Sequence, residues 1–210
     1  MYFQDRIDAA EQLAIALQPW RARHPLVLAI ARGAVPMGQV LADRLEADFD
    51  VVLVRKLRAP FSPELAVGAI DESGWAYIAP YAGEIGANPD YLAREKAAQL
   101  DTLRRRRALY TPGRAPIEAG GRVVIVVDDG LATGATMIAA LHSVRARQPS
   151  RLICAVPVGA PDSVALVAAH ADEMVCLHQP AFFGAVGRFY ADFRQVEDDE
   201  VVRLLAREKK

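Results

Sequence analysis

The sequence lacks the features of a membrane or disulfide-rich secreted protein. No apolar run approaches the ~18 residues that a membrane-spanning helix needs, and residues 1–6 (MYFQDR) carry charges where a signal peptide has an apolar stretch. The two cysteines, Cys154 and Cys176, lie in apolar segments without the ligand spacing of a zinc site. We therefore expect a cytoplasmic protein with two buried free thiols.

Lysine is also scarce. The four lysines among 25 basic residues are Lys56, Lys96, Lys209 and Lys210, so nearly all positive charge is guanidinium, which favours two-point recognition of anions. The basic residues are balanced by 26 acidic ones, which gives a net charge of −1. No overall field attracts the chain to nucleic acid or to a membrane surface, so any polyanion has to be bound locally.

The length and composition are those of a compact domain. Hydrophobic residues make up 52% and charged residues 24%, which excludes a disordered chain. A typical domain has ~150 residues, so 210 residues predict a single domain with appendages.

Apolar segments alternate with helical patterns along most of the chain. The expected strands are 26–31, 50–54, 122–127, 151–156 and 173–177, and the expected helices are 5–18, 35–45, 134–147, 162–170 and 198–207. This alternation predicts an α/β fold with a doubly wound, mostly parallel sheet and flanking helices. The core would cover about residues 20–178, with the first helix as an N-terminal extension.

The region after the second expected strand departs from this alternation. Residues 55–64 contain two prolines and a basic cluster, which predict an irregular loop. Residues 65–70 and 75–78 flank the turn-forming tetrapeptide DESG and predict a hairpin beside the main sheet. Residues 88–110 are predicted to form an inserted charged helix. Its arginine run 104–107 is either a solvated helix end or part of a binding site.

The most informative stretch is residues 123–136, VVIVVDDGLATGAT. Five apolar residues predict a strand buried on both faces that ends in Asp128 and Asp129, where open α/β sheets bind ligands. Two glycines and two threonines follow in a loop that enters the next helix: Gly130, Gly134, Thr133 and Thr136. A helix N-terminus favours a phosphate, and adjacent carboxylates suit two ribose hydroxyls. The stretch therefore predicts a sugar-phosphate site; the alternative is a plain strand-to-helix connection with an Asp or Thr cap.

This stretch resembles the phosphoribosyl-diphosphate (PRPP) binding motif of the type I phosphoribosyltransferases. The resemblance extends over about residues 20–196. Residues 31–34 (ARGA) are similar to the family's pyrophosphate loop, residues 56–64 to its flexible loop, and the aromatic, glycine-rich residues 179–196 to its hood. The chain is most similar to a branch of the family whose acceptor is unassigned. The resemblance implies PRPP as substrate, Mg²⁺ as cofactor, a role in nucleotide metabolism and a homodimer.

The resemblance also implies a role for each matching residue. Asp128 and Asp129 would hold the ribose 2- and 3-hydroxyls, and Arg32 would take the pyrophosphate, whose charge grows as it leaves. The other implied contacts to PRPP are Gly33, Lys56, Gly130, Ala132, Thr133, Gly134, Ala135, Thr136 and Arg194. Magnesium would arrive with PRPP and bridge its oxygens, with Asp128 and Asp129 as candidate protein ligands.

Three further expectations concern the rim of the site. Arg194 is similar to a hood arginine that reaches pyrophosphate in some members, with an exposed or carboxylate-paired arginine as the alternative. Three hood aromatics either stack a base or simply pack: Phe182, Phe183 and Phe189. The resemblance implies a cis peptide bond between Ala31 and Arg32 and a loop over 56–64 that closes to exclude water.

Two departures from the family concern the acceptor. Members that act on 6-oxopurines commonly have an Asp where this chain has Ala132. They also have a Lys after the strand that corresponds to 151–156, whereas no lysine lies between Lys96 and Lys209. Hypoxanthine and guanine are therefore poor candidates. We expect transfer to another nucleobase or amine, or exchange with a phosphorylated sugar; the alternative is a PRPP-binding sensor with little or no catalysis.

Overall fold

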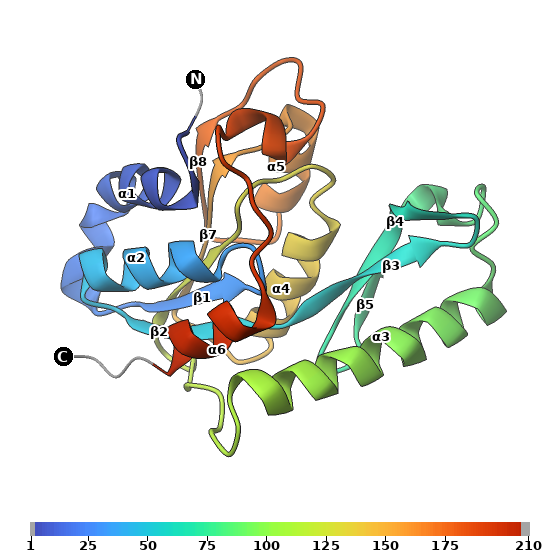
Figure 1. Cartoon of the computed structure of the whole chain (residues 1–210), viewed down its shortest axis with the longest axis horizontal. Helices are drawn as coiled ribbons and strands as arrows, with labels where there is room; N and C mark the ends of the chain where they lie inside the picture. Colours follow the sequence, from blue (N-terminus) through green and yellow to red (C-terminus); the bar gives the residue numbers. More distant parts are fainter. Residues whose placement is uncertain (1–2, 207–210) are drawn as a thin grey trace.

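The structure, a computed structural model, describes residues 3–206 apart from the side chains of Pro63 and Glu64. Its centre is a five-stranded parallel sheet with the strand order β2-β1-β6-β7-β8 (Figure 1). The strands are β1 (Leu26–Ile30), β2 (Asp48–Val52), β6 (Val123–Val127), β7 (Arg151–Val158) and β8 (Glu173–His178). The expected doubly wound parallel sheet is confirmed.

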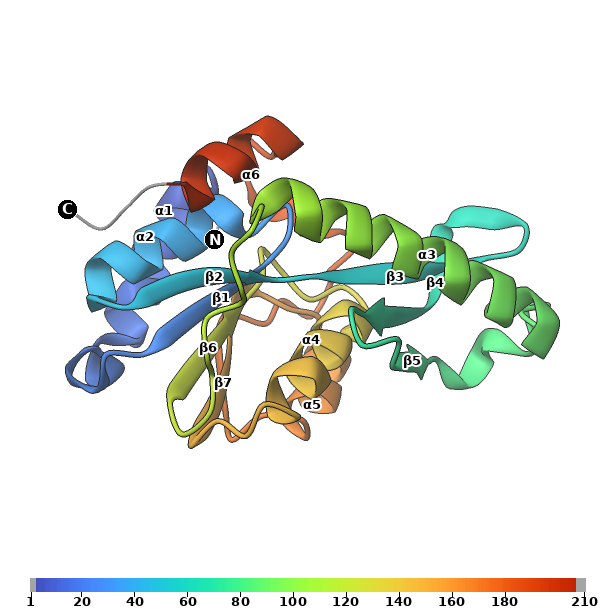
Figure 2. The same cartoon turned by 90° about the horizontal axis from the view of Figure 1, so that it is seen from below.

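Helices cover both faces of this sheet because its strands are apolar on both sides. Along β1, Val27 and Ala29 belong to one core cluster, whereas Leu26, Leu28 and Ile30 belong to the other. One face carries α1 (Arg6–Ala16) and α2 (Val35–Leu45), and the opposite face carries α4 (Ala135–Arg145) and α5 (Pro161–Ala168) (Figure 2). No helix among residues 3–206 is both long and apolar enough to cross a membrane.

An arm extends from one end of the sheet in both views (Figures 1 and 2). It consists of the antiparallel strands β3 (Val54–Ala59), β4 (Ser62–Asp71) and β5 (Ala76–Ile78), along which α3 (Pro89–Tyr110) packs. Leu53 is the one residue between β2 and β3, so the chain passes from the parallel sheet into the arm without a loop. The hairpin over 65–78 and the inserted helix over 88–110 are thereby confirmed.

The irregular loop expected over 55–64 is wrong, because most of this segment lies in β3 and β4. Ala59 pairs with Ser62, so Pro60 and Phe61 occupy a two-residue turn, where a proline removes no ladder hydrogen bond. Two register shifts, on either side of Arg58, give the hairpin its irregularity. The basic residues that suggested a loop instead lie along a strand.

The N-terminal segment meets the hood near β8 (Figure 1). Phe3 forms an isolated parallel bridge with Tyr190 of the hood, which contains a short 3-10 helix, Val186–Phe189, and little other regular structure. The last helix, α6 (Asp198–Leu205), packs near α2 and α3. Its expected end at residue 207 lies outside the described residues.

The two cysteines are free thiols, as expected. Cys154 is buried, whereas Cys176 is partly exposed, which corrects its expected full burial: it lies on β8 at the sheet edge. Burial raises the pKa of the Cys154 thiol above its usual range and that of Cys176 to about 11, so neither is a ready nucleophile at neutral pH.

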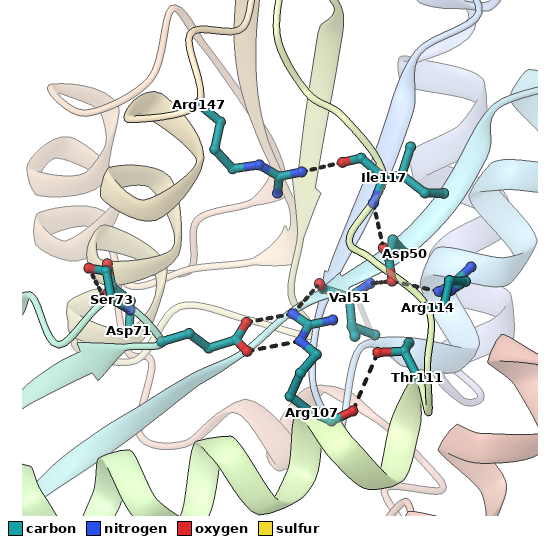
Figure 3. Close-up of polar contacts among 10 residues, drawn as sticks. Asp50, Val51, Asp71, Ser73, Arg107, Thr111, Arg114, Ile117 and Arg147 are labelled. Carbon is teal, nitrogen blue, oxygen red and sulfur yellow. Dashed lines mark hydrogen bonds and ion pairs between the residues drawn. The ribbon is translucent and has the colours of Figure 1, made fainter.

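A polar cluster anchors the arm and the following segment to β2 (Figure 3). Arg107 of α3 pairs with Glu72 and also donates to the Val51 carbonyl of β2. Asp50, which is 1% exposed, accepts hydrogen bonds from Arg114 (2.8 Å) and from the Ile117 amide (3.0 Å). These bonds fix the base of α3 against the parallel sheet.

Replacing Asp50 is expected to destabilise the fold without altering any residue of the cavity described below. Asp50→Ala leaves the Ile117 amide without its acceptor and Arg114 without its carboxylate, which costs roughly 2 kcal/mol in the free energy of unfolding. Urea denaturation measures this change. The control is Asp43→Ala, which removes an exposed carboxylate that accepts one bond from Gln39; equal losses in both variants would contradict the anchoring role.

Candidate functional site

A cavity of about 420 Å³ lies at the carboxyl edge of the parallel sheet, between the ends of β1 and β6 and the arm. Most of the residues expected in the site line it: Arg32, Gly33, Lys56, Asp128, Asp129, Gly130, Ala132, Thr133, Gly134 and Thr136. These residues come from segments up to about a hundred positions apart in the chain. The fold therefore brings the acidic pair, the glycine-threonine loop and the arginine loop to one place.

Asp128 and Asp129 form the acidic floor of the cavity. The Asp129 amide donates to the Asp128 carboxylate (2.9 Å), and both residues line the cavity. Burial, followed by the neighbouring charge of Asp129, raises the pKa of Asp128 well above its usual range. Burial also raises the pKa of Asp129, but the charge of Arg6 opposes this shift. The charged form of each carboxyl is therefore poorly solvated, and a polar or cationic ligand would stabilise it.

Arg6 is a site residue that sequence reasoning missed. Its Nε and Nη2 atoms donate to Asp129 Oδ2 at 2.9 and 2.8 Å, although the two residues are 123 positions apart. The side chains of Arg6 and Asp129 are only 10% and 16% exposed. No local sequence pattern around Arg6 predicts this contact, because the contact forms only when the N-terminal segment packs against the folded sheet.

The loop after the acidic pair has the form of an anion cradle. Gly134 precedes α4 with a φ of +77°, a conformation that favours glycine, and thereby turns the chain into the helix N-terminus. The Ser163 hydroxyl of α5 donates to the Ala132 carbonyl (2.7 Å), which fixes the loop to α5. Within residues 3–206, no hydrogen bond uses the amides of Ala132, Thr133 or Gly134. These amides and the first turn of α4 are therefore available to a phosphate.

Cations form another part of the cavity lining, which we call the cationic wall. The Ala31–Arg32 peptide bond is cis, as expected, and Arg32 lies near Glu197 (3.4 Å) and Asp198 (3.5 Å). Further along the wall are four cations of the arm: Arg55, Lys56, Arg58 and Arg106. Burial lowers the pKa of Arg55, and the charges of three other arginines add to this effect. Such a concentration of positive charge suits a highly charged anion.

The arginine run 104–107 of α3 was expected to be either a solvated helix end or part of a binding site, and its members divide between the two. Arg106 lines the cavity, whereas Arg107 binds Glu72 in the anchor shown in Figure 3. Arg105 is exposed and pairs with Asp101 one helical turn away. Consecutive residues of a helix point in different directions, so neighbouring arginines of this run have different partners.

The structure places the remaining candidates outside the cavity lining. Arg194 pairs with Glu200 (2.8 and 3.0 Å) and is largely exposed, which matches the alternative of a carboxylate-paired arginine. Phe182 is 96% exposed, and Phe183 packs on Phe189 with ring centroids 5.2 Å apart. Ala135 is buried in the first turn of α4. From the hood, Val186 lines the cavity instead.

Replacing Asp128 is expected to stabilise the protein at high pH. A carboxyl in the unfolded chain has a pKa of ~3.9, whereas that of Asp128 is raised in the folded protein. The folded protein binds more protons between these values, so stability falls as pH rises through the folded pKa. Asp128→Asn removes this loss. Its melting temperature should exceed that of the wild type at pH 8 and match it at pH 4, whereas the exposed Asp43→Asn control should match it at both.

The chain is similar to several known proteins. A family model described as a phosphoribosyl transferase domain matches residues 4–194. The chain is 44% identical over 207 residues to provisionally named phosphoribosyl transferases of two Mycobacterium tuberculosis strains, CDC 1551 and H37Rv. These matches cover 98% of this chain but 46% of each relative, so the chain spans about half the length of the curated relatives it matches.

Solved structures share the fold of this chain. The crystal structure of TT1426 from Thermus thermophilus is 44% identical, has a TM-score of 0.81 and matches over 98% of both chains. A hypoxanthine phosphoribosyltransferase from Staphylococcus aureus is 12% identical with a TM-score of 0.50, over 95% of this chain and 91% of that one. The second likeness shows the shared fold alone.

Proposed function

Because this chain belongs to the phosphoribosyl transferase family, we propose that it transfers the 5-phosphoribosyl group of PRPP to a nitrogen acceptor and releases pyrophosphate. The carrying observation is one cavity that joins an acidic pair, a free amide loop at a helix N-terminus and a cationic wall. These three surfaces match the three parts of PRPP, which are the ribose hydroxyls, the 5-phosphate and the pyrophosphate.

The acidic pair and the loop bind and orient the sugar in this proposal. Asp128 and Asp129 accept hydrogen bonds from the ribose hydroxyls. The amides of residues 130–136 and the hydroxyls of Thr133 and Thr136 hold the 5-phosphate. This arrangement positions the anomeric carbon over the cavity, where a nitrogen nucleophile displaces the pyrophosphate.

The cationic wall stabilises the leaving group. As the bond between the anomeric carbon and the pyrophosphate oxygen breaks, negative charge accumulates on the pyrophosphate, and Arg32, the Gly33 amide and Lys56 face that charge. Arg55, Arg58 and Arg106 add to the same field. Positioning and charge stabilisation thus account for the catalysis, with no covalent enzyme intermediate.

Magnesium fits this site as a cation that arrives with the substrate. Among the described residues there is no group of three or more His, Cys, Asp and Glu side chains that would hold a metal alone. Asp128 and Asp129 would hold it from the protein side, and one Asp129 oxygen is already bonded to Arg6. When bound, Mg²⁺ would neutralise part of the charge of the pyrophosphate.

The acceptor is expected to be a nucleobase or another amine, but not a 6-oxopurine. Reading a 6-oxo group requires a hydrogen-bond donor near the base plane. The segment 157–163 contains no basic residue, and its one acidic residue is Asp162. Ala132 stands where the family's 6-oxopurine enzymes commonly have an Asp, so it supplies no acidic partner. A missing polar partner costs up to ~10⁴-fold in discrimination. We therefore expect hypoxanthine and guanine to react at least about a hundredfold less efficiently than the best acceptor.

Pyrophosphate release from PRPP over a panel of bases, amines and phosphorylated sugars tests both statements. Release with one acceptor class supports the transferase, and steady-state competition ranks the 6-oxopurines against it. A preference for hypoxanthine or guanine would contradict the acceptor prediction. Tight PRPP binding without release for every acceptor would favour a PRPP sensor. The protein with Asp128→Asn and Asp129→Asn serves as the inactive control.

A further inference from the structure

We propose that Arg6 is a positioning residue for the reaction, which holds Asp129 in place for the ribose. This inference rests on the proposed function and deepens it, because Arg6 is not among the residues that the cavity presents to a ligand. Arg6 belongs to the first turn of α1, an element that contributes no residue to the cavity lining among the described residues. Its role is to act through Asp129.

The contact is specific to an arginine. Nε and Nη2 both donate to Asp129 Oδ2, while Nη1 donates to the Arg194 carbonyl (2.7 Å). The guanidinium lies 3.9 Å from the centroid of the Phe193 ring. A planar group with separate donors meets all three partners at once, whereas a lysine ammonium on a flexible stem does not.

The bond to Arg6 decides which Asp129 oxygen remains for a ligand. Arg6 binds Oδ2 of Asp129. A Cβ atom at position 33 would lie 2.5 Å from the same Oδ2, so only a glycine at this position lets the loop over residues 31–34 approach the Asp129 carboxylate. Within residues 3–206, no side chain of another residue donates a hydrogen bond to Oδ1. Arg6 therefore fixes one oxygen of Asp129 and leaves the other without a partner side chain beside the cavity.

The same contact joins the N-terminal segment and the hood to the acidic pair. The Phe3 amide donates to the Phe189 carbonyl (2.7 Å), and the Ala191 amide donates to the Phe3 carbonyl (2.8 Å). Tyr190 then donates from its hydroxyl to the Asp129 carbonyl (2.7 Å). Asp129 is thus held at its side chain by Arg6 and at its backbone by Tyr190, both from this joined pair of segments.

A double-mutant cycle tests whether Arg6 acts through Asp129. The magnesium-dependent affinity for PRPP is measured by calorimetry for the wild type, Arg6→Gln, Asp129→Asn and the double variant. Arg6→Gln should lose about tenfold in affinity in the wild-type background and less than about twofold when Asp129 is already Asn, because the shared interaction is gone. Arg6→Lys keeps the charge and should recover only part of the loss.

A matched control separates this role from a general effect of losing an ion pair. Arg44→Gln removes an arginine that donates two bonds to Glu11 (2.7 and 2.8 Å) on the surface between α1 and α2, and it should leave PRPP affinity unchanged. An equal loss for Arg6→Gln in both Asp129 backgrounds would overturn the proposal, because Arg6 would then act through the fold alone.

A crystal structure of Arg6→Gln gives a readout that needs no ligand. The Asp129 side chain should leave its position against Gly33, and an unchanged carboxylate would overturn the positioning role. A wild-type protein that binds no PRPP would refute the proposed function, whereas the position of Asp129 in this variant would still decide the role of Arg6. The two failures are therefore distinguishable.

Discussion

The protein with Asp128→Asn and Asp129→Asn is expected to lose PRPP binding almost completely. In the proposed complex, each carboxylate accepts a hydrogen bond from a ribose hydroxyl and faces the magnesium carried by PRPP. Charge-assisted hydrogen bonds contribute roughly 1.5 to 3 kcal/mol each, so the affinity should fall by roughly 10²- to 10⁴-fold. Isothermal titration with magnesium and PRPP measures the loss.

A surface variant controls for the change in net charge. Asp43→Asn with Glu46→Gln removes two carboxylates near the end of α2, both of them exposed, and should bind PRPP as the wild type does. Wild-type affinity in the Asp128/Asp129 variant would refute the ribose assignment. A loss in both variants would show that overall charge, and not the acidic pair, determines binding.

Arg32→Ala should separate the pyrophosphate end of the site from the sugar end. If Arg32 faces the pyrophosphate, the Arg32→Ala protein should bind PRPP with an affinity lower by roughly 10- to 100-fold, which is the scale of one lost charge-assisted contact. Ribose 5-phosphate has no pyrophosphate, so its affinity should change by less than about twofold. Titration of both ligands against the same variant gives the comparison directly.

Two further variants make this test specific. Arg105→Ala removes an exposed arginine of α3 that pairs with Asp101, and it should affect neither ligand. Arg32→Lys keeps the charge but loses the planar donors, so it should recover part of the PRPP affinity. Equal losses for PRPP and ribose 5-phosphate in Arg32→Ala would instead assign Arg32 to holding the loop against Glu197 and Asp198.

The core was predictable from the sequence because its strands are short, apolar and regularly spaced. Val123–Val127 is buried on both faces, so its composition alone indicates a central parallel strand, and the two acids that follow fall at the ligand-binding edge. Segment 54–59 was missed because its pattern is weak. Arg55, Lys56 and Arg58 interrupt the apolar residues, and the strand is stabilised by partners in β4 that no local window contains.

The site was predictable only as far as a local motif extends. The acidic pair and the loop after it lie within nine positions, from Asp128 to Thr136, and the fold keeps them together. Arg106, which lines the cavity, and Arg6, which binds Asp129, come from outside any such motif and reach their places through tertiary packing. Arg194 and the hood aromatics failed to reach the cavity for the same reason, since similarity of sequence did not fix the direction of their side chains.

The direct passage from β2 into β3 affects how the cavity meets a ligand. Leu53, the residue between them, is 1% exposed, and β3 is hydrogen-bonded to β4 over its length. Arg55, Lys56 and Arg58 are therefore carried on ordered backbone and not on a loop that must be immobilised at each binding event. Ordering a flexible residue costs ~1 to 2 kcal/mol in conformational entropy, and a wall built on paired strands avoids most of that cost. The incoming anion thus meets a field of cations that is already assembled.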